Sequence, residues 1–238
     1  KQNVISPQSG WQKMTDILWD TSSIDIFYLK DRWAHAVTCL SGRTAVYRRE
    51  ILLSLADEMV SETFGGKRVI SGEDKCLTRL VQQAGWHTCY QRNAQVFSSA
   101  AIDFSTFWKQ RVRWSRNTWR SDLKSLWGGW VWKHPYLAFY MLDRFISPFT
   151  LFIAPVALGI AIGLNQWIVV LALLTWILVS RGVRIWFHLK HHPNDILVLP
   201  VYIAATYITA AAKIYALFTL NKQGWITRWS KDRAANIS

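Results

Sequence analysis

The chain has 238 residues, of which 51% are hydrophobic, and it carries a formal net charge of +13. A chain of this length can hold one or two domains. The positive charge requires a polyanionic partner or surface, and nucleic acid is the usual candidate. The basic residues gather beside apolar segments, however, so anionic lipid headgroups and nucleotide diphosphates explain their placement better than nucleic acid does.

The composition changes along the chain. Up to about Lys133 the charges are distributed as in a soluble α/β protein, and beyond it long apolar stretches dominate. The three cysteines share no metal spacing, which favours free thiols in a reducing compartment. The chain opens on Lys1-Gln2-Asn3-Val4 as if inside a domain, so we expect a C-terminal fragment of a longer protein.

The first half predicts alternating strands and helices. Residues 38–47 predict a strand, a Ser-Gly turn and a second extended run. Residues 50–60 have the apolar spacing of a helix, and the two glycines in residues 65–68 predict a loop.

A second helix is expected to begin at Asp74, because apolar residues then recur at helical spacing up to Gly85, which is typical of a residue that ends a helix. Residues 86–90 and 95–97 predict two further short strands.

Residues 103–127 predict a long amphipathic helix with bulky aromatic side chains on one side and Lys and Arg on the other. A helix of this kind tends to lie in a membrane surface. The alternative is a core helix with a solvated basic face.

Three apolar stretches follow, at residues 145–164, 166–179 and 196–220. A helix that crosses a membrane needs about 20 apolar residues. The first stretch is long enough, and the second is long enough only if it continues past Arg181. The third contains Pro200, so we expect it to be bent.

The topology of these stretches is constrained by their charges. A tight turn at residues 165–166 makes the first two antiparallel. Basic residues near Arg184 and after Lys222 mark both segments as cytoplasmic. A single membrane crossing by the third stretch would put these two segments on opposite sides of the membrane. We therefore expect the third stretch to lie in the membrane surface or to re-enter it.

Gln110, Arg113 and Trp114 are candidate binding residues. At positions i, i+3 and i+4 of a helix they project from one face. The planar guanidinium suits phosphate oxygens, the amide adds a donor, and the indole suits the apolar face of a sugar ring. The alternative for Arg113-Trp114 alone is a surface arginine beside an anchoring tryptophan.

Asp74 is the candidate catalytic residue. It lies in Ser71-Gly72-Glu73-Asp74, where an extended segment meets a helix. A carboxylate held rigidly there could act as a general base that takes a proton from a sugar hydroxyl. The alternative is structural, because Asp is also a preferred helix-capping residue.

These residues resemble the processive family 2 glycosyltransferases, which include hyaluronan, chitin, chitin-oligosaccharide and cellulose synthases. Asp74 is similar to the family's catalytic base, and Gln110, Arg113 and Trp114 to its Q-x-x-R-W motif. Ser41-Gly42 resembles the turn beside the acceptor site. The resemblance thus implies that the donor diphosphate is bound by Gln110 and Arg113. It implies that the acceptor is bound by Trp114, Ser41, Gly42 and Glu73.

The C-terminal segment is similar to that of hyaluronan synthases, which ends in W-G-T-R. Here it reads Trp225-Ile226-Thr227-Arg228. The resemblance implies that Trp225, Thr227 and Arg228 close over the pyrophosphate of the donor, and that Ile226 in place of Gly makes the loop stiffer.

The resemblance implies an α/β catalytic domain of the GT-A type, of which only the C-terminal half is present, followed by amphipathic interface helices and a transmembrane α-helical region. The expected boundaries are residues 1–102 for the catalytic half, 103–140 for the interface helices, 141–220 for the membrane helices and 221–238 for a cytoplasmic gating-loop-like tail.

The implied reaction is an inverting transfer from a UDP-sugar donor to a β-linked polysaccharide acceptor, in a multi-pass protein of the plasma (inner) membrane whose catalytic domain is cytoplasmic and whose helices contact membrane lipids. A Mg²⁺ or Mn²⁺ ion is expected, with its ligands mainly in the missing N-terminal half and none in this chain. The alternatives are a non-processive family 2 transferase that makes an oligosaccharide or glycolipid, and a small membrane transporter or scaffold.

Overall fold

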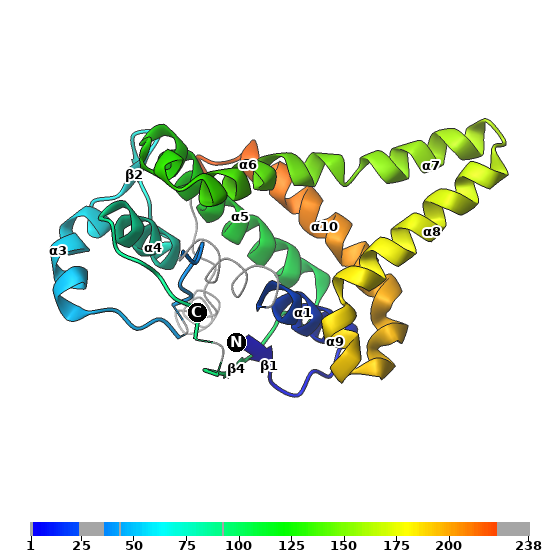
Figure 1. Ribbon diagram of the computed structural model, residues 1–238, viewed down its shortest axis with the longest axis horizontal. Helices are drawn as coiled ribbons and strands as arrows, with labels where there is room; N and C mark the ends of the chain where they lie inside the picture. Colours follow the sequence, from blue (N-terminus) through cyan, green and yellow to red (C-terminus); the bar gives the residue numbers. More distant parts are fainter. Residues whose placement is uncertain (1, 24–35, 43, 92, 223–238) are drawn as a thin grey trace, which may run out of the picture.

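Helices account for most of the described chain, and the strands are short (Figure 1). This computed structural model describes residues 2–23, 36–42, 44–91 and 93–222. The elements of the first part are β1 (Gln2–Val4), α1 (Gly10–Thr21), α3 (Arg49–Val60), β2 (Thr63–Phe64), β3 (Lys67–Arg68), α4 (Glu73–Gln83) and β4 (Val96–Ser98). Those of the second part are α5 (Phe104–Trp127), η2 (Trp130–Lys133), α6 (Pro135–Thr150), α7 (Ile153–Gly163), α8 (Trp167–Arg184), α9 (Trp186–His191), η3 (Pro193–Val198) and α10 (Leu199–Leu217).

The strands β1 and β4 pair in parallel, with Gln2 opposite Val96. Their pairing joins the beginning of the chain to the segment that leads into α5. The strand β4 confirms the strand predicted at residues 95–97, displaced by one residue. Helix α1 begins at Ser9, whose hydroxyl accepts a hydrogen bond from the Gln12 backbone in a capping box.

The strands predicted within residues 38–47 are wrong, although the turn between them is confirmed. The Thr44 N–H donates to the Ser41 carbonyl at 3.0 Å. The segment before the turn is held by a side chain, since the Leu40 N–H donates to the Thr78 hydroxyl at 2.8 Å. Because a threonine of α4 takes the place of a neighbouring strand, no ladder forms here.

Helix α4 confirms the helix predicted from Asp74. Gly85 lies in the left-handed region at φ 86°, which is the conformation expected of a residue that ends a helix. The strand predicted at residues 86–90 is wrong. The Thr88 hydroxyl accepts the Val37 N–H at 2.8 Å, so a side chain again replaces a strand partner.

Helix α3 confirms the helix predicted at residues 50–60. Of the loop predicted at residues 65–68, Gly65 and Gly66 form the turn of a two-stranded hairpin, with φ 57° and 75°. The other two residues, Lys67 and Arg68, form its second strand, β3.

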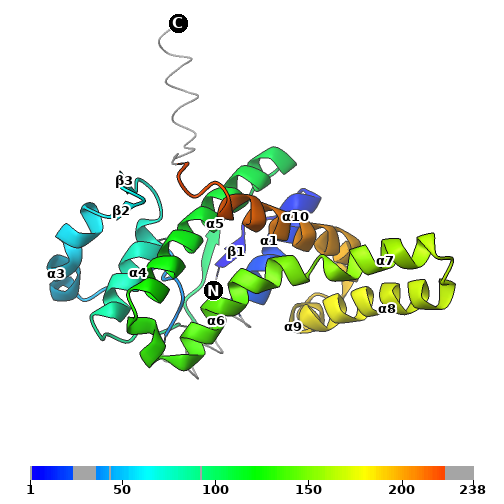
Figure 2. The ribbon, with the colours of Figure 1, turned by 90° about the horizontal axis from the view of Figure 1, so that it is seen from above.

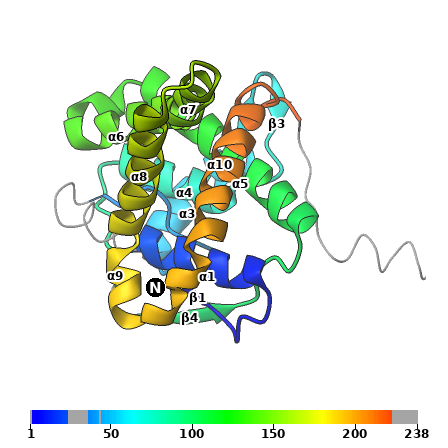
Figure 3. The same cartoon turned by 90° about the vertical axis from the view of Figure 1, so that its right-hand side faces the viewer.

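Helix α5 confirms the long helix predicted at residues 103–127, and it is unbroken. Asp103 caps its first turn by accepting the Thr106 N–H at 2.9 Å. Helix α10 packs along α5, as Figure 3 shows. The buried Ala212 and Ala216 permit this close approach, and the Trp119 indole donates to the Lys213 carbonyl at 2.9 Å.

Three helical segments of the described chain are long and apolar enough to cross a membrane. They confirm the three predicted apolar stretches, although the first begins earlier and the second continues through Arg181 and Arg184. Their bounds are Pro135–Gly163, Trp167–Arg184 and Pro193–Leu217. Pro200 lies in the first turn of α10, directly after η3, where a proline does not break the helix, and α10 then runs unbroken to Leu217. The bend expected in this stretch stays a prediction.

Helices α7 and α8 form an antiparallel hairpin that extends away from the remainder of the molecule (Figures 1 and 2). Its turn contains Asn165 at φ 52°, which confirms the tight turn predicted at residues 165–166. Helix α6 contains Pro148 and ends at Thr150, a short break before α7.

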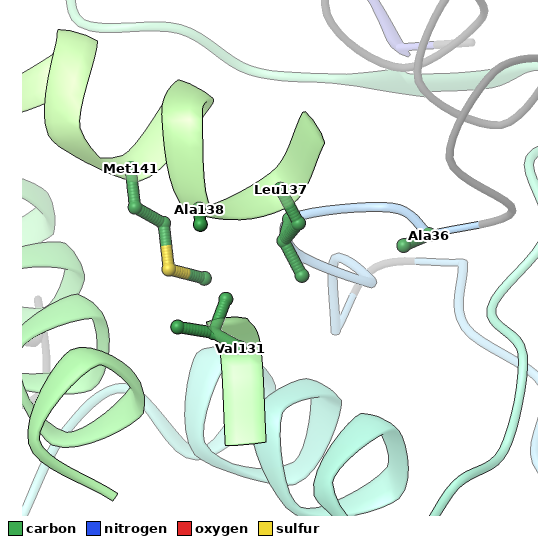
Figure 4. Close-up of a cluster of buried hydrophobic side chains, with 5 residues drawn as sticks. All are labelled: Ala36, Val131, Leu137, Ala138 and Met141. Carbon is green, nitrogen blue, oxygen red and sulfur yellow. The ribbon is translucent and has the colours of Figure 1, made fainter. Parts of the chain in front are cut away.

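A small buried cluster fixes the beginning of α6 against η2 and the segment at Ala36 (Figure 4). Val131 of η2 contacts Leu137, Ala138 and Met141 of α6, and Ala36 closes the cluster. Val131 and Leu137 are at most 1% exposed. The first apolar helix is therefore anchored to the segment that leads into the predicted acceptor turn.

Candidate active site

Asp74 lies in the first turn of α4, two residues after the capping position at Gly72. It is half-buried, and one of its carboxylate oxygens accepts the Lys75 N–H at 2.7 Å. The exposed Glu73 turns back, and its carboxylate accepts the Gly72 N–H at 3.0 Å. The two acidic side chains are therefore held differently, and Asp74 is the more enclosed of the pair.

The turn Ser41-Gly42 lies directly against Asp74. A Cβ atom at position 42 would be 3.8 Å from the Cβ of Asp74. Cys39, just before the turn, has its pKa raised to about 12 by burial and then by the negative charge of Asp74. The structure thus brings the predicted base and the predicted acceptor turn together and keeps the neighbouring thiol neutral.

A buried ion network holds the first turn of α4 in place. Lys75 lies 3.1 Å from one carboxylate oxygen of Asp122, and Arg144 lies 2.8 Å from the other. The Lys75 ammonium also donates to the Thr38 carbonyl. Asp122 is fully buried. This carboxylate therefore connects α4, α5 and the first apolar helix, α6.

Trp114 and Arg111 line a cavity of about 270 Å³ together with Cys39, Lys75 and Tyr140. The guanidinium carbon of Arg111 lies 5.3 Å from the Trp114 ring centre, which is a cation–π distance. Burial lowers the pKa of Arg111 to about 10, so this side chain is still a cation at neutral pH.

The three residues of the predicted Q-x-x-R-W motif do not all face this cavity. Trp114 does, whereas Gln110 and Arg113 are absent from its lining. The Gln110 side-chain oxygen is buried and has no hydrogen-bond partner among the described residues. The sequence did not predict Arg111 as a site residue, because Arg111 is one of the Lys and Arg residues that form the basic side of the helix at residues 103–127. Its position three residues before Trp114, on the same side of a helix, could have identified it.

Two larger cavities adjoin this one. A cavity of about 550 Å³ lies on the side of the acceptor turn and shares Cys39 with it. A cavity of about 460 Å³ lies among α6, α8 and α10 and shares Arg111 and Lys213 with it. Ser22, at the end of α1, lines all three. The cavities therefore form a row from Ser41 to the apolar helices.

Trp225, Thr227 and Arg228 lie outside the described residues. The chain just before them is fixed beside α5. The buried Arg120 donates to the carbonyls of Leu220 at 2.7 Å and Lys222 at 2.9 Å.

Residues 20–117 match the family model described as "Glycosyltransferase like family 2". The chain carries a glycosyltransferase family 2 domain, which confirms the family and the enzyme class predicted above and implies a GT-A fold for its catalytic part.

The curated relatives point the same way. An N-acetylglucosaminyltransferase of Rhizobium meliloti is 32% identical over 243 residues, which cover 89% of this chain and 52% of the relative. Hyaluronan synthase 1 of Xenopus tropicalis is 28% identical over 84% of this chain and 34% of its own length. The hyaluronan synthase of Streptococcus pyogenes is 25% identical over 91% and 51%. The chain thus spans about half or less of each relative, and with its three apolar helices the comparison indicates a membrane protein.

Enzymes of this family typically use a divalent metal ion. Within the part of the chain that the structure describes, no group of three His, Cys, Asp or Glu side chains could hold one. The described residues therefore supply no donor set for the ion.

Proposed function

We propose that the whole protein is a membrane-embedded, inverting glycosyltransferase that builds a β-linked polysaccharide from UDP-sugars and passes it into the membrane helices. One observation carries the proposal: Asp74 and the turn Ser41-Gly42 lie together beside a row of cavities that continues past Trp114 to the apolar helices.

In this proposal Asp74 is the general base. Its carboxylate takes the proton of the acceptor hydroxyl, and the resulting oxygen attacks the anomeric carbon of the donor from the side opposite the diphosphate. The new C–O bond forms as the bond to the UDP oxygen breaks, so the configuration inverts and UDP leaves. Ser41, Gly42 and Glu73 border the position of the acceptor hydroxyl.

Residues of α5 have two roles in this proposal. Trp114 holds the acceptor ring at the cavity, where its indole stacks on the sugar. Gln110 and Arg113, which do not line this cavity, bind the donor diphosphate together with Trp225, Thr227 and Arg228 of the tail. A hydrogen-bond donor that points at the charge developing in the transition state contributes about 3–4 kcal/mol.

The membrane assignment is part of the same proposal. Residues 1–102 form the catalytic part on the cytoplasmic side of the inner membrane, residues 103–140 lie at its surface, residues 141–220 lie within it and residues 221–238 form the gating tail. The basic residues at the end of α8 favour a cytoplasmic position there. We expect the ligands of Mg²⁺ or Mn²⁺ mainly in the N-terminal part of the full-length protein.

The test uses membranes that contain the full-length parent protein, supplied with labelled UDP-GlcNAc and UDP-GlcA, singly and together, with Mg²⁺ or Mn²⁺. Polymer that requires both donors would identify a hyaluronan-type product, and polymer from UDP-GlcNAc alone a chitin-type product. Absence of incorporation from these donors and from UDP-glucose would contradict the proposal.

A second candidate is a non-processive transferase that makes a short oligosaccharide or a glycolipid. The relatives named N-acetylglucosaminyltransferases, whose names state a sugar transfer and no polymer, support this candidate. The catalytic residues would be the same, so the length of the product separates the two candidates.

A further inference from the structure

The residue that precedes the acidic pair is packed against α5 without any space for a side chain. Gly72 has φ 95°, in the left-handed region. A Cβ atom at this position would lie 2.6 Å from the Cγ of Asn117, a distance that atoms in contact do not reach. The Asn117 side chain therefore rests directly on the backbone from which Asp74 projects, and only glycine permits both the conformation and the approach.

Polar contacts strengthen this junction. The Ser71 hydroxyl donates to the Asn117 side-chain oxygen at 3.1 Å. The Arg120 guanidinium donates to the same oxygen at 3.3 Å, and its other nitrogens hold the carbonyls of Leu220 and Lys222. A chain of contacts thus leads from the turn before Asp74, through one amide of α5, to the segment that follows α10.

Asn117 also lies on the helix that carries Trp114, three residues further on. The side chain that supports the base is therefore part of the same rigid element as the proposed acceptor platform. Neither Asn117 nor Ser71 lines any of the three cavities described above.

We propose that Asn117 is a positioning residue, which fixes the Ser71-Gly72 turn so that Asp74 keeps its distance from the acceptor held on α5, and which joins this turn through Arg120 to the segment after α10. The inference rests on the proposed transferase function. Asn117 acts through Asp74 and makes no contact with the sugar.

The test compares two substitutions of similar size in the full-length protein. Asn117→Asp keeps an oxygen that accepts from Ser71 and Arg120, whereas Asn117→Leu has the same shape without an acceptor. A small displacement of a catalytic group lowers the rate by up to about 100-fold, so we expect Asn117→Leu to lower kcat about 10- to 100-fold with KM for the UDP-sugar changed less than about threefold. Asn117→Asp should retain most of kcat.

The link itself is tested by a double-mutant cycle with Ser71→Ala. If the two side chains act together, the double variant Ser71→Ala, Asn117→Leu should have a kcat only slightly below that of Ser71→Ala alone. Asn194→Leu, at an exposed asparagine of η3, is the matched control and should leave kcat unchanged.

Two results would overturn the inference: kcat of Asn117→Leu equal to that of the wild type, or full additivity with Ser71→Ala. A merely structural role would lower the amount of protein that binds UDP-sugar rather than kcat per binding site, so binding is measured on each variant. An active parent with unaffected variants refutes this inference alone, whereas a parent inactive with every donor refutes the proposed function.

Discussion

Asp74 derives its proposed role from its surroundings more than from its place in a helix. Asp74 accepts the Lys75 N–H within the first turn of α4, but the capping position is occupied by Gly72. Asp74 instead lies against Gly42 and the neutral thiol of Cys39. This environment favours the general base over the structural alternative.

The corresponding prediction concerns Asp74→Asn. The amide has almost the same shape but cannot take a proton, so we expect transfer to fall below a few per cent of the wild-type rate while UDP-sugar binding is retained. General acid–base catalysis contributes about 10²–10⁴-fold, which sets this expectation. Initial rates and donor binding would be measured on the same membranes. A variant that polymerises at a tenth of the wild-type rate or more would refute the assignment.

At this scale the sequence predicted the residue types better than their partners. Asp74 and Gly42 were singled out from their motifs, and they lie in contact. Arg111 and Asn117 were not, because their importance depends on which side of α5 faces the cavity and which faces α4. That choice is made by tertiary packing, which helical spacing alone does not determine.

At the scale of elements, α5 organises the molecule. It packs against α10 and α4, and its fully buried Asp122 pairs with Lys75 of α4 and Arg144 of α6. Two cations share one fully buried carboxylate. Removing one member of such a group leaves uncompensated buried charge, which is much more costly than replacing the whole group with apolar side chains.

We therefore expect Asp122→Ala to destabilise the protein by about 3–5 kcal/mol, seen as a lower unfolding temperature in detergent. The triple replacement Lys75→Met, Asp122→Leu and Arg144→Met should recover much of this loss. If Asp122→Ala unfolds at the wild-type temperature, the network does not hold these helices together.

His188 connects α1 to the segment between α8 and α10. Its ring nitrogens lie 2.9 Å from carboxylate oxygens of Asp20 in α1 and Asp195 in η3, and the ring of His192 is 5.0 Å away. With an acceptor at each nitrogen, the imidazolium form satisfies both contacts. Burial opposes the charge, but the hydrogen bonds to Asp20 and Asp195 outweigh it, so the pKa of His188 is raised above 6.5.

The sign of the pH dependence follows from this shift. Stabilisation by His188 is fully present below pH 6.5 and is lost as the pH rises through the higher pKa of the folded state. Hydrogen exchange of the α9 amides, corrected for the pH dependence of the intrinsic exchange rate, should therefore become faster as the pH rises above 6.5. The variant His188→Gln should show a smaller change. Equal pH dependence in both proteins would contradict the role of His188.

The elements that sequence predicted well are those whose stability is local. Helices α3, α4 and α5 have apolar periodicity, and Asp103 marks the beginning of α5 as Gly85 marks the end of α4. The strands expected at residues 38–47 and 86–90 have the right alternation, but side chains take the place of strand partners: the Leu40 N–H donates to the Thr78 hydroxyl, and the Thr88 hydroxyl accepts the Val37 N–H. A hydrogen bond between a strand-like segment and a distant threonine leaves no periodic signal in the sequence.

At the scale of the whole molecule, the parts lie in the order that synthesis followed by transfer into a membrane would require. The turn Ser41-Gly42, which lies beside Asp74, borders one end of the row of cavities through Ser41. Trp114 lines the middle cavity, and the cavity at the other end lies among the apolar helices with Arg181 and Arg184. The sequence predicted the membrane helices from their length and composition. It could not predict that α10 would pack along α5, since that contact depends on Ala212 and Ala216, which lie at least 85 positions after the end of α5 in the sequence.

One small side chain lies where the three cavities meet. Ser22 borders all of them, and its hydroxyl is already engaged with the Leu18 carbonyl at 2.7 Å. A growing product that occupied the row would have to pass this position. The size of the side chain at position 22 would therefore limit the length of the product. Ser22→Trp should stop the product after a few sugars while the first bonds still form, and Ser22→Ala should leave the length unchanged. Electrophoretic sizing of the product would decide, and long chains from Ser22→Trp would mean that the polymer leaves by another route.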